Sequence, residues 1–82
     1  MKINEKIVVE TSGDKNTKAL VPRRIIWKNH GYLVEKIGLH HAFWRGRERI
    51  HVFSLVAGGI FFRLELNTED LIWFLDEIEN EQ

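Results

Sequence analysis

Apolar and polar residues alternate along most of this chain, in short runs separated by turn-forming residues. A period of two is typical of strands with one buried face, and strands recurring at short intervals indicate an all-β domain. The first candidate strand covers residues 6–11, and residues 12–19 form the most loop-like stretch. Pro22 biases Val21 to extended backbone. We therefore expect an N-terminal strand and flexible loop over residues 1–20 and a small barrel domain over residues 21–82.

The chemistry of the turns predicts how the strands pair. A two-residue turn at Gly58-Gly59 sets Leu55 opposite Phe62, a four-residue loop covers residues 67–70, and a third hairpin is centred on Gly46. All three turns agree on one buried face, since the register of each hairpin fixes which residues point to the core. The expected core residues are Ile37, Leu39, Phe53, Leu55, Phe62, Leu64, Leu66, Leu71, Trp73 and Leu75, with Trp73 and Trp27 as the largest buried groups.

A further turn at Asn29-His30 pairs Trp27 with Tyr32, but this hairpin is out of phase with Ile37. A β-bulge near Glu35-Lys36 restores the phase and bends the strand. A bend of this kind lets a short meander curl and limits its exposed edges. The expected fold is therefore all-β, a five- to six-stranded antiparallel meander curled into a partly open barrel.

The last element has two interpretations. Thr68-Glu69-Asp70 also resembles a helix N-cap followed by acidic residues, which would give an α+β fold with a C-terminal helix from about Thr68. We favour the strand, because it places Trp73 in the core and completes the register. The strand leaves Phe61, Ile72 and Phe74 on the opposite face, where the N-terminal strand or a partner must cover them.

Length and composition exclude several classes of protein. With 82 residues the chain forms one small domain, and without cysteine it has no disulfide scaffold, thiol nucleophile or thiolate metal site. No apolar run has the length of a membrane span, and the N-terminus lacks the apolar core of a signal peptide. We therefore expect a cytoplasmic protein with no membrane partner.

The neutral net charge conceals a segregation of charges. Residues 15–63 contain ten Lys and Arg against Glu35 and Glu48, whereas residues 64–82 contain seven acidic residues and no basic one. A basic segment of this kind suits an anionic partner. The alternative is that the acidic segment neutralises the basic one, within the molecule or between two copies.

Catalytic chemistry has little support in the sequence. Ser12 falls in the expected loop and Ser54 in a strand, and neither has a glycine-flanked elbow or an evident base. Gly58-Gly59 is better explained as a hairpin turn than as a phosphate-binding loop. We therefore expect no enzyme, no catalytic residue and no cofactor.

The histidines invite a metal interpretation. The predicted register sets His41 opposite His51, with His40 beside them, and the available third ligands are Glu65 or Glu10. A zinc site needs three or four ligands, and His40 and His41 point to opposite faces of a strand. We expect a half-buried aromatic pair at the end of the core and no metal.

The segment over residues 40–49 is the most informative stretch of the chain. It places aromatic and basic residues on a hairpin tip: Phe43, Trp44, Arg45, Arg47 and Arg49. Arginine grips phosphate oxygens and aromatic faces stack on exposed bases, so this combination suits single-stranded DNA or RNA. Lys28 and Arg63 are candidate flanking charges. A rival hypothesis is a protein-interaction or self-association module that uses Phe61, Ile72 and Phe74.

The order of core and turn residues from Val21 onward resembles a known family. The matching positions are Pro22, Ile25, Trp27, Tyr32, Val34, Phe62, Leu64, Leu66, Trp73, Leu75 and Ile78. They resemble a small uncharacterised bacterial β-barrel domain, found alone or appended to the C-terminus of Y-family DNA polymerases. The resemblance implies a setting in nucleic-acid metabolism and carries over no binding residue.

Overall fold

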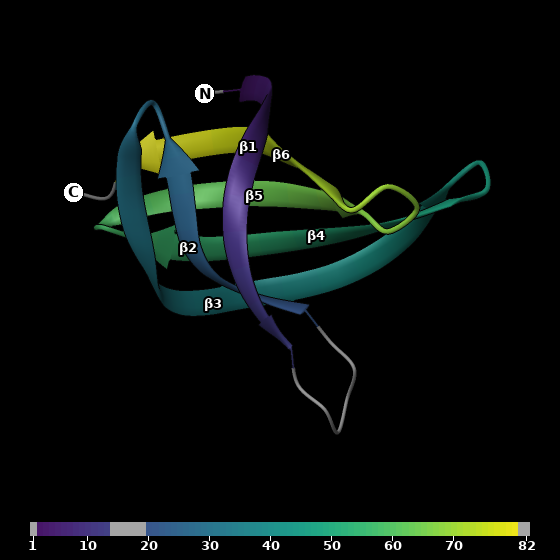
Figure 1. The fold of residues 1–82 in the computed structure, drawn as a ribbon, viewed down its shortest axis with the longest axis horizontal. Helices are drawn as coiled ribbons and strands as arrows, with labels where there is room; N and C mark the ends of the chain where they lie inside the picture. The colour runs from purple at the N-terminus through teal and green to yellow at the C-terminus, as the bar shows by residue number, and fades with distance from the viewer. Residues whose placement is uncertain (1, 14–19, 81–82) are drawn as a thin grey trace.

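Six antiparallel strands form a closed barrel. The computed structural model describes residues 2–13 and 20–80. The strands are β1 (Lys2–Gly13), β2 (Leu20–Trp27), β3 (His30–Arg45), β4 (Glu48–Ala57), β5 (Ile60–Asn67) and β6 (Ile72–Asn80). Each strand pairs with the next, and β1 pairs with β6 to close the sheet (Figure 1). The all-β meander is confirmed, while the part of the expected loop at residues 14–19 lies outside the described residues.

The C-terminal segment is a strand, so the alternative with a helix from about Thr68 is wrong. β6 pairs with β5 along its length and with β1 on its other side. In residues 2–13 and 20–80 there is no helix that could span a membrane.

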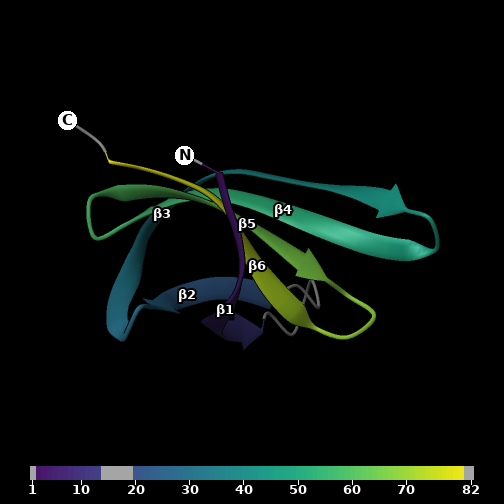
Figure 2. The same ribbon diagram turned by 90° about the horizontal axis from the view of Figure 1, so that it is seen from above.

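The barrel is flattened into two layers. β1 changes partner along its length, pairing with β6 through Ile7 and with β2 from Val8 onward. β3 also belongs to both layers, since its start pairs with β2 and the remainder pairs with β4. Figure 2 shows β2 and the end of β1 as the layer facing β3, β4 and β5. The core lies between these layers.

The core matches most of the predicted face. Trp73 is 6% exposed, and its ring lies 5.4 Å from that of Phe53. Trp27 is only half-buried, with its ring edge-on to Phe62 at 6.4 Å and its Nε1 donating to Glu5 Oε2. The buried cluster comprises Ile25, Phe53, Leu55, Ala57, Phe62, Leu64, Leu66, Trp73 and Leu75.

The β4–β5 hairpin has the predicted register. Leu55 lies opposite Phe62, and Phe53 lies opposite Leu64. Gly58 and Gly59 have φ of 58° and 74°. Two consecutive positive φ values are typical of a type I′ turn, which matches the twist of the strands and which glycine adopts without strain.

The β5–β6 register differs from the prediction by two residues next to the turn, from Leu64 to Asn67, and by three beyond a further irregularity between Arg63 and Leu64, where Phe62 lies opposite Ile78. Leu64 lies opposite Leu75 rather than Trp73, and the connecting loop covers residues 68–71. A shift of two preserves the buried face, because side chains alternate with that period. The exception is Leu71, which is 60% exposed with φ of 59°. Its N–H donates to the Asn67 carbonyl at 2.8 Å, so it belongs to the turn and not to the core.

The β2–β3 turn lies one residue before its predicted position, which moves the pairing of the two strands by two residues. Lys28 and Asn29 are its central residues, with φ of 50° and 65°, and Trp27 lies opposite His30. The predicted bulge near Glu35 is confirmed, because the pairing of β3 with β4 shifts between Val34 and Lys36.

A second bulge overturns part of the predicted β3 register. The pairing shifts again between Ile37 and Leu39, and the hairpin turns at Gly46-Arg47 instead of centring on Gly46. Ile37 lies opposite Leu55 as predicted. It is nevertheless exposed, because β2 pairs with β3 only as far as Leu33 and does not cover Ile37. Leu39 lies opposite Ser54 and is 56% exposed, so placing Leu39 in the core was wrong. An odd shift moves every following side chain to the other face.

Candidate nucleic-acid interface

The tip of the β3–β4 hairpin projects from the barrel. β3 and β4 remain paired as far as Arg45 and Glu48, whereas the last β5 residue paired with β4 is Asn67, opposite Ile50. We name residues 43–49 the hairpin arm, which extends past the end of β5 (Figure 1). Gly46 supplies the positive φ, 62°, at the first central position of the turn.

The base of the hairpin arm is fixed by the β5–β6 loop. The Arg49 carbonyl accepts hydrogen bonds from the Thr68 N–H at 3.1 Å and the Thr68 hydroxyl at 2.9 Å. The side-chain amide of Asn67 donates to the Glu48 carboxylate. These contacts hold the start of β4 in place, so the hairpin arm presents its side chains from an ordered base.

The aromatic residues of the hairpin arm point to opposite faces. His40 lies opposite Phe53 in the core, so alternation along β3 places Trp44 on this inner face and Phe43 on the outer face. Trp44 is 63% exposed and Phe43 is 37% exposed. The guanidinium of Arg49 lies 5.2 Å from the centre of the Trp44 ring. The inner face therefore presents a large aromatic plane covered on one side by a cation.

The arginines differ in whether a carboxylate neutralises them. Arg45 forms an ion pair with Glu65 at 2.9 Å and lies 5.5 Å from the Phe43 ring. Arg63 forms an ion pair with Glu77 at 3.2 Å. Arg47 and Arg49 have no ion pair with any carboxylate in the described part of the chain. The acidic segment thus neutralises part of the basic segment but leaves the tip and the inner face of the hairpin arm positive.

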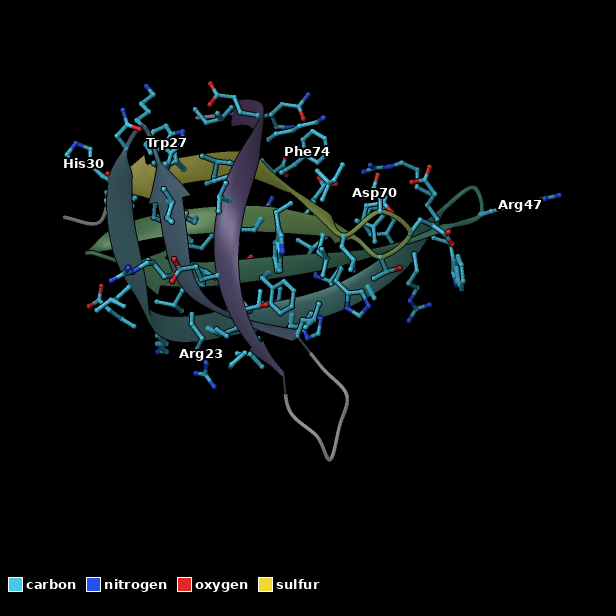
Figure 3. The ribbon with its side chains drawn as sticks, viewed as in Figure 1. Arg23, Trp27, His30, Arg47, Asp70 and Phe74 are labelled. Atoms are coloured by element: carbon cyan, nitrogen blue, oxygen red, sulfur yellow. The ribbon has the colours of Figure 1, made fainter. Side chains whose placement is uncertain are left out.

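The structure separates the two predicted flanking charges from the hairpin arm. Lys28 lies in the β2–β3 turn with its ammonium 4.7 Å from the Trp27 ring, at the opposite end of a molecule 36 Å long. Figure 3 shows Trp27 at one end and Arg47 at the other. Arg63 lies on the outer face of β5, opposite Ser54 and Glu77. The predicted residues brought together are Phe43, Trp44, Arg45, Arg47 and Arg49.

The apolar residues predicted for protein interaction share the outer face but do not touch as one patch. Phe61, Ile72 and Phe74 are each half-buried. The ion pair of Arg63 with Glu77 lies in the rungs between Phe61 and the other two. β1 lies beside this face, with Lys6 paired with Phe74, and does not cover it.

His40, and not His41, pairs with His51. His41 lies opposite Val52 on the outer face, because of the bulge at Gly38. The Nε2 of His40 lies 2.8 Å from the Nδ1 of His51, a hydrogen bond between the two rings. Within residues 2–13 and 20–80, no group of three or more His, Cys, Asp or Glu side chains could hold a metal ion.

Both histidines of this pair favour the neutral state. Burial lowers the pKa of His40, and the positive charges of His51 and His41 lower it further. Burial also lowers the pKa of His51, with a contribution from Arg49. A neutral pair can share one N–H between two ring nitrogens, whereas two imidazolium rings would direct N–H groups at each other.

The site therefore combines an exposed indole, two unpaired guanidinium groups and an ordered base at one end of the barrel. The sequence showed these residue types but not the split between faces. Comparison with known proteins gave no match to a family model, a curated protein or a solved structure.

Proposed function

We propose that this protein is a non-catalytic module that binds single-stranded nucleic acid through the hairpin arm. The observation that carries the proposal is Trp44, whose ring is 63% exposed and has the Arg49 guanidinium over one side. The residues match the chemistry of an unpaired base and its phosphate.

Each contact residue has a distinct role in this proposal. The Trp44 ring stacks on one base, and Arg49 supports the stack and reaches an adjacent phosphate. Arg47, at the turn, binds a second phosphate with its fork of N–H donors. Phe43 and Arg45 contact a strand that passes over the tip to the outer face. Arg45 contributes less, since Glu65 already neutralises it.

A duplex is a poorer match than a single strand. Its bases are stacked on one another, so a single aromatic plane on a narrow hairpin would have to unstack them. Single-stranded DNA and RNA expose the faces of their bases at no such cost. The sequence resemblance to a domain appended to Y-family polymerases supports the same setting, in the cytoplasm of a bacterium.

Fluorescence anisotropy of labelled oligo-dT and oligo-U, each about twelve nucleotides long, tests the proposal. We expect binding at low salt, with affinity falling as salt is raised because phosphate contacts release counterions. Trp44→Ala removes a stacking contact of about 1–3 kcal/mol, a loss of roughly five- to 150-fold in affinity. Arg47→Gln should reduce both the affinity and its dependence on salt.

Lys28→Gln is the matched control for Arg47→Gln. It removes one positive charge at the opposite end of the barrel, so affinity should remain within about twofold of wild type. No binding at low salt, or equal losses from Lys28→Gln and Arg47→Gln, would contradict the proposal. Equal losses would mean that the whole protein attracts nucleic acid through its charge alone.

A second candidate function is association with a protein partner or a second copy through Phe61, Ile72 and Phe74. These residues keep part of their apolar surface accessible on the outer face. The half-burial of each residue and the ion pair between them favour the hairpin arm over this surface.

A further inference from the structure

One edge of β3 has no strand beside it for most of its length. β2 pairs only with the start of β3, where Arg24 lies opposite Leu33. From Val34 to Arg45, the only described strand paired with β3 is β4. Every second residue of this stretch therefore directs its backbone N–H and C=O groups outward, which makes the edge a template for another strand.

Exposed apolar side chains concentrate on the same strand. Of the eight large hydrophobic residues exposed in the described part of the chain, five lie on β3: Leu33, Ile37, Leu39, Phe43 and Trp44. The residues from Glu35 to His41 are all exposed. A strand with free backbone groups and exposed aliphatic side chains is what edge pairing requires, and it is otherwise a hazard for aggregation.

A pocket opens on the outer face of the sheet, from the second bulge of β3 across β4 to Phe61 on β5. Its volume is about 400 Å³, and its lining includes Lys36, Gly38, Leu39, Ser54, Val56 and Phe61. Gly38 has no side chain to close the pocket, and a Cβ there would make only an ordinary contact, 3.6 Å from the Ser54 carbonyl oxygen. A side chain from a strand added at the free edge of β3 can therefore pass over Gly38 and reach the β3 side of the pocket, next to Leu39.

We propose that the free edge of β3 binds an extended segment of a partner protein by adding a strand to the sheet. The partner segment carries an aliphatic residue that fills the pocket, with acidic residues two positions away on the same face. Beyond Gly38 the ladder of β3 with β4 continues without a further shift, so residues 39–42, which precede the hairpin arm, offer a regular stretch for pairing. Recognition of this kind takes affinity from backbone hydrogen bonds and specificity from side-chain pockets.

The charges beside the pocket select an acidic partner. Lys36 lines the pocket and has no ion pair with a described carboxylate. Glu35, the neighbouring acid, accepts a hydrogen bond from the Gly59 N–H at 2.8 Å, which directs it toward the β4–β5 turn. A polypeptide matches the spaced N–H and C=O groups of the edge, whereas a nucleic acid offers no complementary backbone. The inference does not depend on the proposed function, since Lys36 and the pocket lie outside the hairpin arm.

The probe is the capped peptide acetyl-Thr-Glu-Val-Leu-Val-Glu-Thr-amide. Leu occupies the pocket, and the two Glu residues lie on the same face as Leu, one of them beside Lys36. Calorimetry measures its affinity, and amide hydrogen exchange by NMR locates it. We expect slowed exchange within residues 39–42 and no change on β5, whose two neighbours already pair with it.

Reversing the charge of Lys36 tests whether this residue selects an acidic peptide. Lys36→Glu should weaken this peptide at least tenfold and strengthen a version with Lys in place of both Glu residues. Lys6→Glu makes the same change on β1, opposite Phe74, and should leave both affinities within twofold of wild type. Oligo-dT binding through the hairpin arm should be nearly unchanged by Lys36→Glu, which separates this proposal from the proposed function.

Three results would overturn the proposal. The first is no binding of the peptide at millimolar concentration. The second is protection of residues 39–42 that rises with protein concentration alone, which would assign the edge to a second copy of the chain. The third is protection by oligo-dT, lost in Lys36→Glu, without protection by the peptide, which would assign the edge to nucleic acid.

Discussion

The imidazole of His40 lies flat against the ring of Phe53, with centroids 4.1 Å apart and planes 9° apart. The Phe53 ring in turn contacts Trp73, 5.4 Å away. The Nε2 of the same His40 ring shares a hydrogen bond with the Nδ1 of His51. A polar pair thus closes the end of the core nearest the hairpin arm, and its protonation state affects the core directly.

Acid should destabilise the fold through this pair. Because the pKa of His40 and that of His51 are lowered in the folded protein, the unfolded chain binds more protons as pH falls. The free energy of unfolding should therefore fall from about pH 6.5, the unfolded pKa of histidine, through the lowered folded values. Urea unfolding between pH 7.5 and pH 4.5 measures this slope.

Substitution isolates the contribution of the histidines from that of the carboxylates. His40→Gln removes one titrating ring, so the loss of stability between pH 6.5 and pH 5 should be smaller than in wild type. His41→Gln, on the outer face, is the matched control and should retain most of the wild-type slope. An identical slope in wild type and His40→Gln would show that the pair does not control acid stability.

Truncation of Trp73 should nearly abolish folding. The side chain is 6% exposed in the buried cluster, and removing a buried aromatic costs about 3–5 kcal/mol. This loss is a large fraction of the stability of a small domain. Trp44→Ala removes the same atoms from an exposed position and should cost less than about 0.5 kcal/mol. Thermal melts of the two variants that differ by only a few degrees would contradict the core assignment.

The turn at Gly58 should be the least tolerant of a side chain. Its φ is 58°, where an L-residue costs about 1–2 kcal/mol, and a Cβ would lie 2.9 Å from Tyr32 Cδ1. Gly59 has φ of 74° but nothing within 4 Å of its Cβ position. Gly58→Ala should therefore lower the melting temperature more than Gly59→Ala. Equal effects would mean that the contact with Tyr32 contributes nothing.

Self-association through the outer face can be tested by one double substitution. Ile72→Thr with Phe74→Thr keeps residues that favour strands while removing apolar surface. If this surface holds a dimer, light scattering should report a dimer for wild type and a monomer for the variant. A wild type that is monomeric at high concentration would exclude self-association here, and nucleic-acid binding should be unchanged in either case.

Much of the fold could be predicted because the positions of the glycine turns and the alternation of apolar and polar residues indicate the same buried face. The turn at Gly58-Gly59 correctly predicted the β4–β5 register. The first bulge of β3 could be predicted because the residues of the β2–β3 hairpin are out of phase with Ile37. Two turns were misplaced by one residue, at Lys28-Asn29 and at residues 68–71, which moved the pairing by two residues and left the buried face next to each turn unchanged. An even error in register is invisible to a hydrophobic pattern whose period is two.

The β3–β4 hairpin shows why the site could not be predicted completely. The bulge at Gly38 and the turn at Gly46-Arg47 together shift the pairing by one residue, which places His40 instead of Leu39 against Phe53. The local sequence does not specify a bulge whose position depends on where the pairing of β2 with β3 ends. The separation of Trp44 from Phe43 and the pairing of Arg45 with Glu65 likewise depend on tertiary contacts.

The most direct test of the hairpin arm as the nucleic-acid interface is an NMR titration of the three tryptophan indole signals with oligo-dT at low salt. Trp44 is exposed on the hairpin arm, Trp73 is buried in the core, and Trp27 lies at the opposite end of the barrel. We expect the Trp44 indole signal to shift to saturation while the other two remain nearly unchanged, with the shift reversed by added salt. Unchanged Trp44 signals in the presence of bound oligonucleotide would contradict the proposed interface.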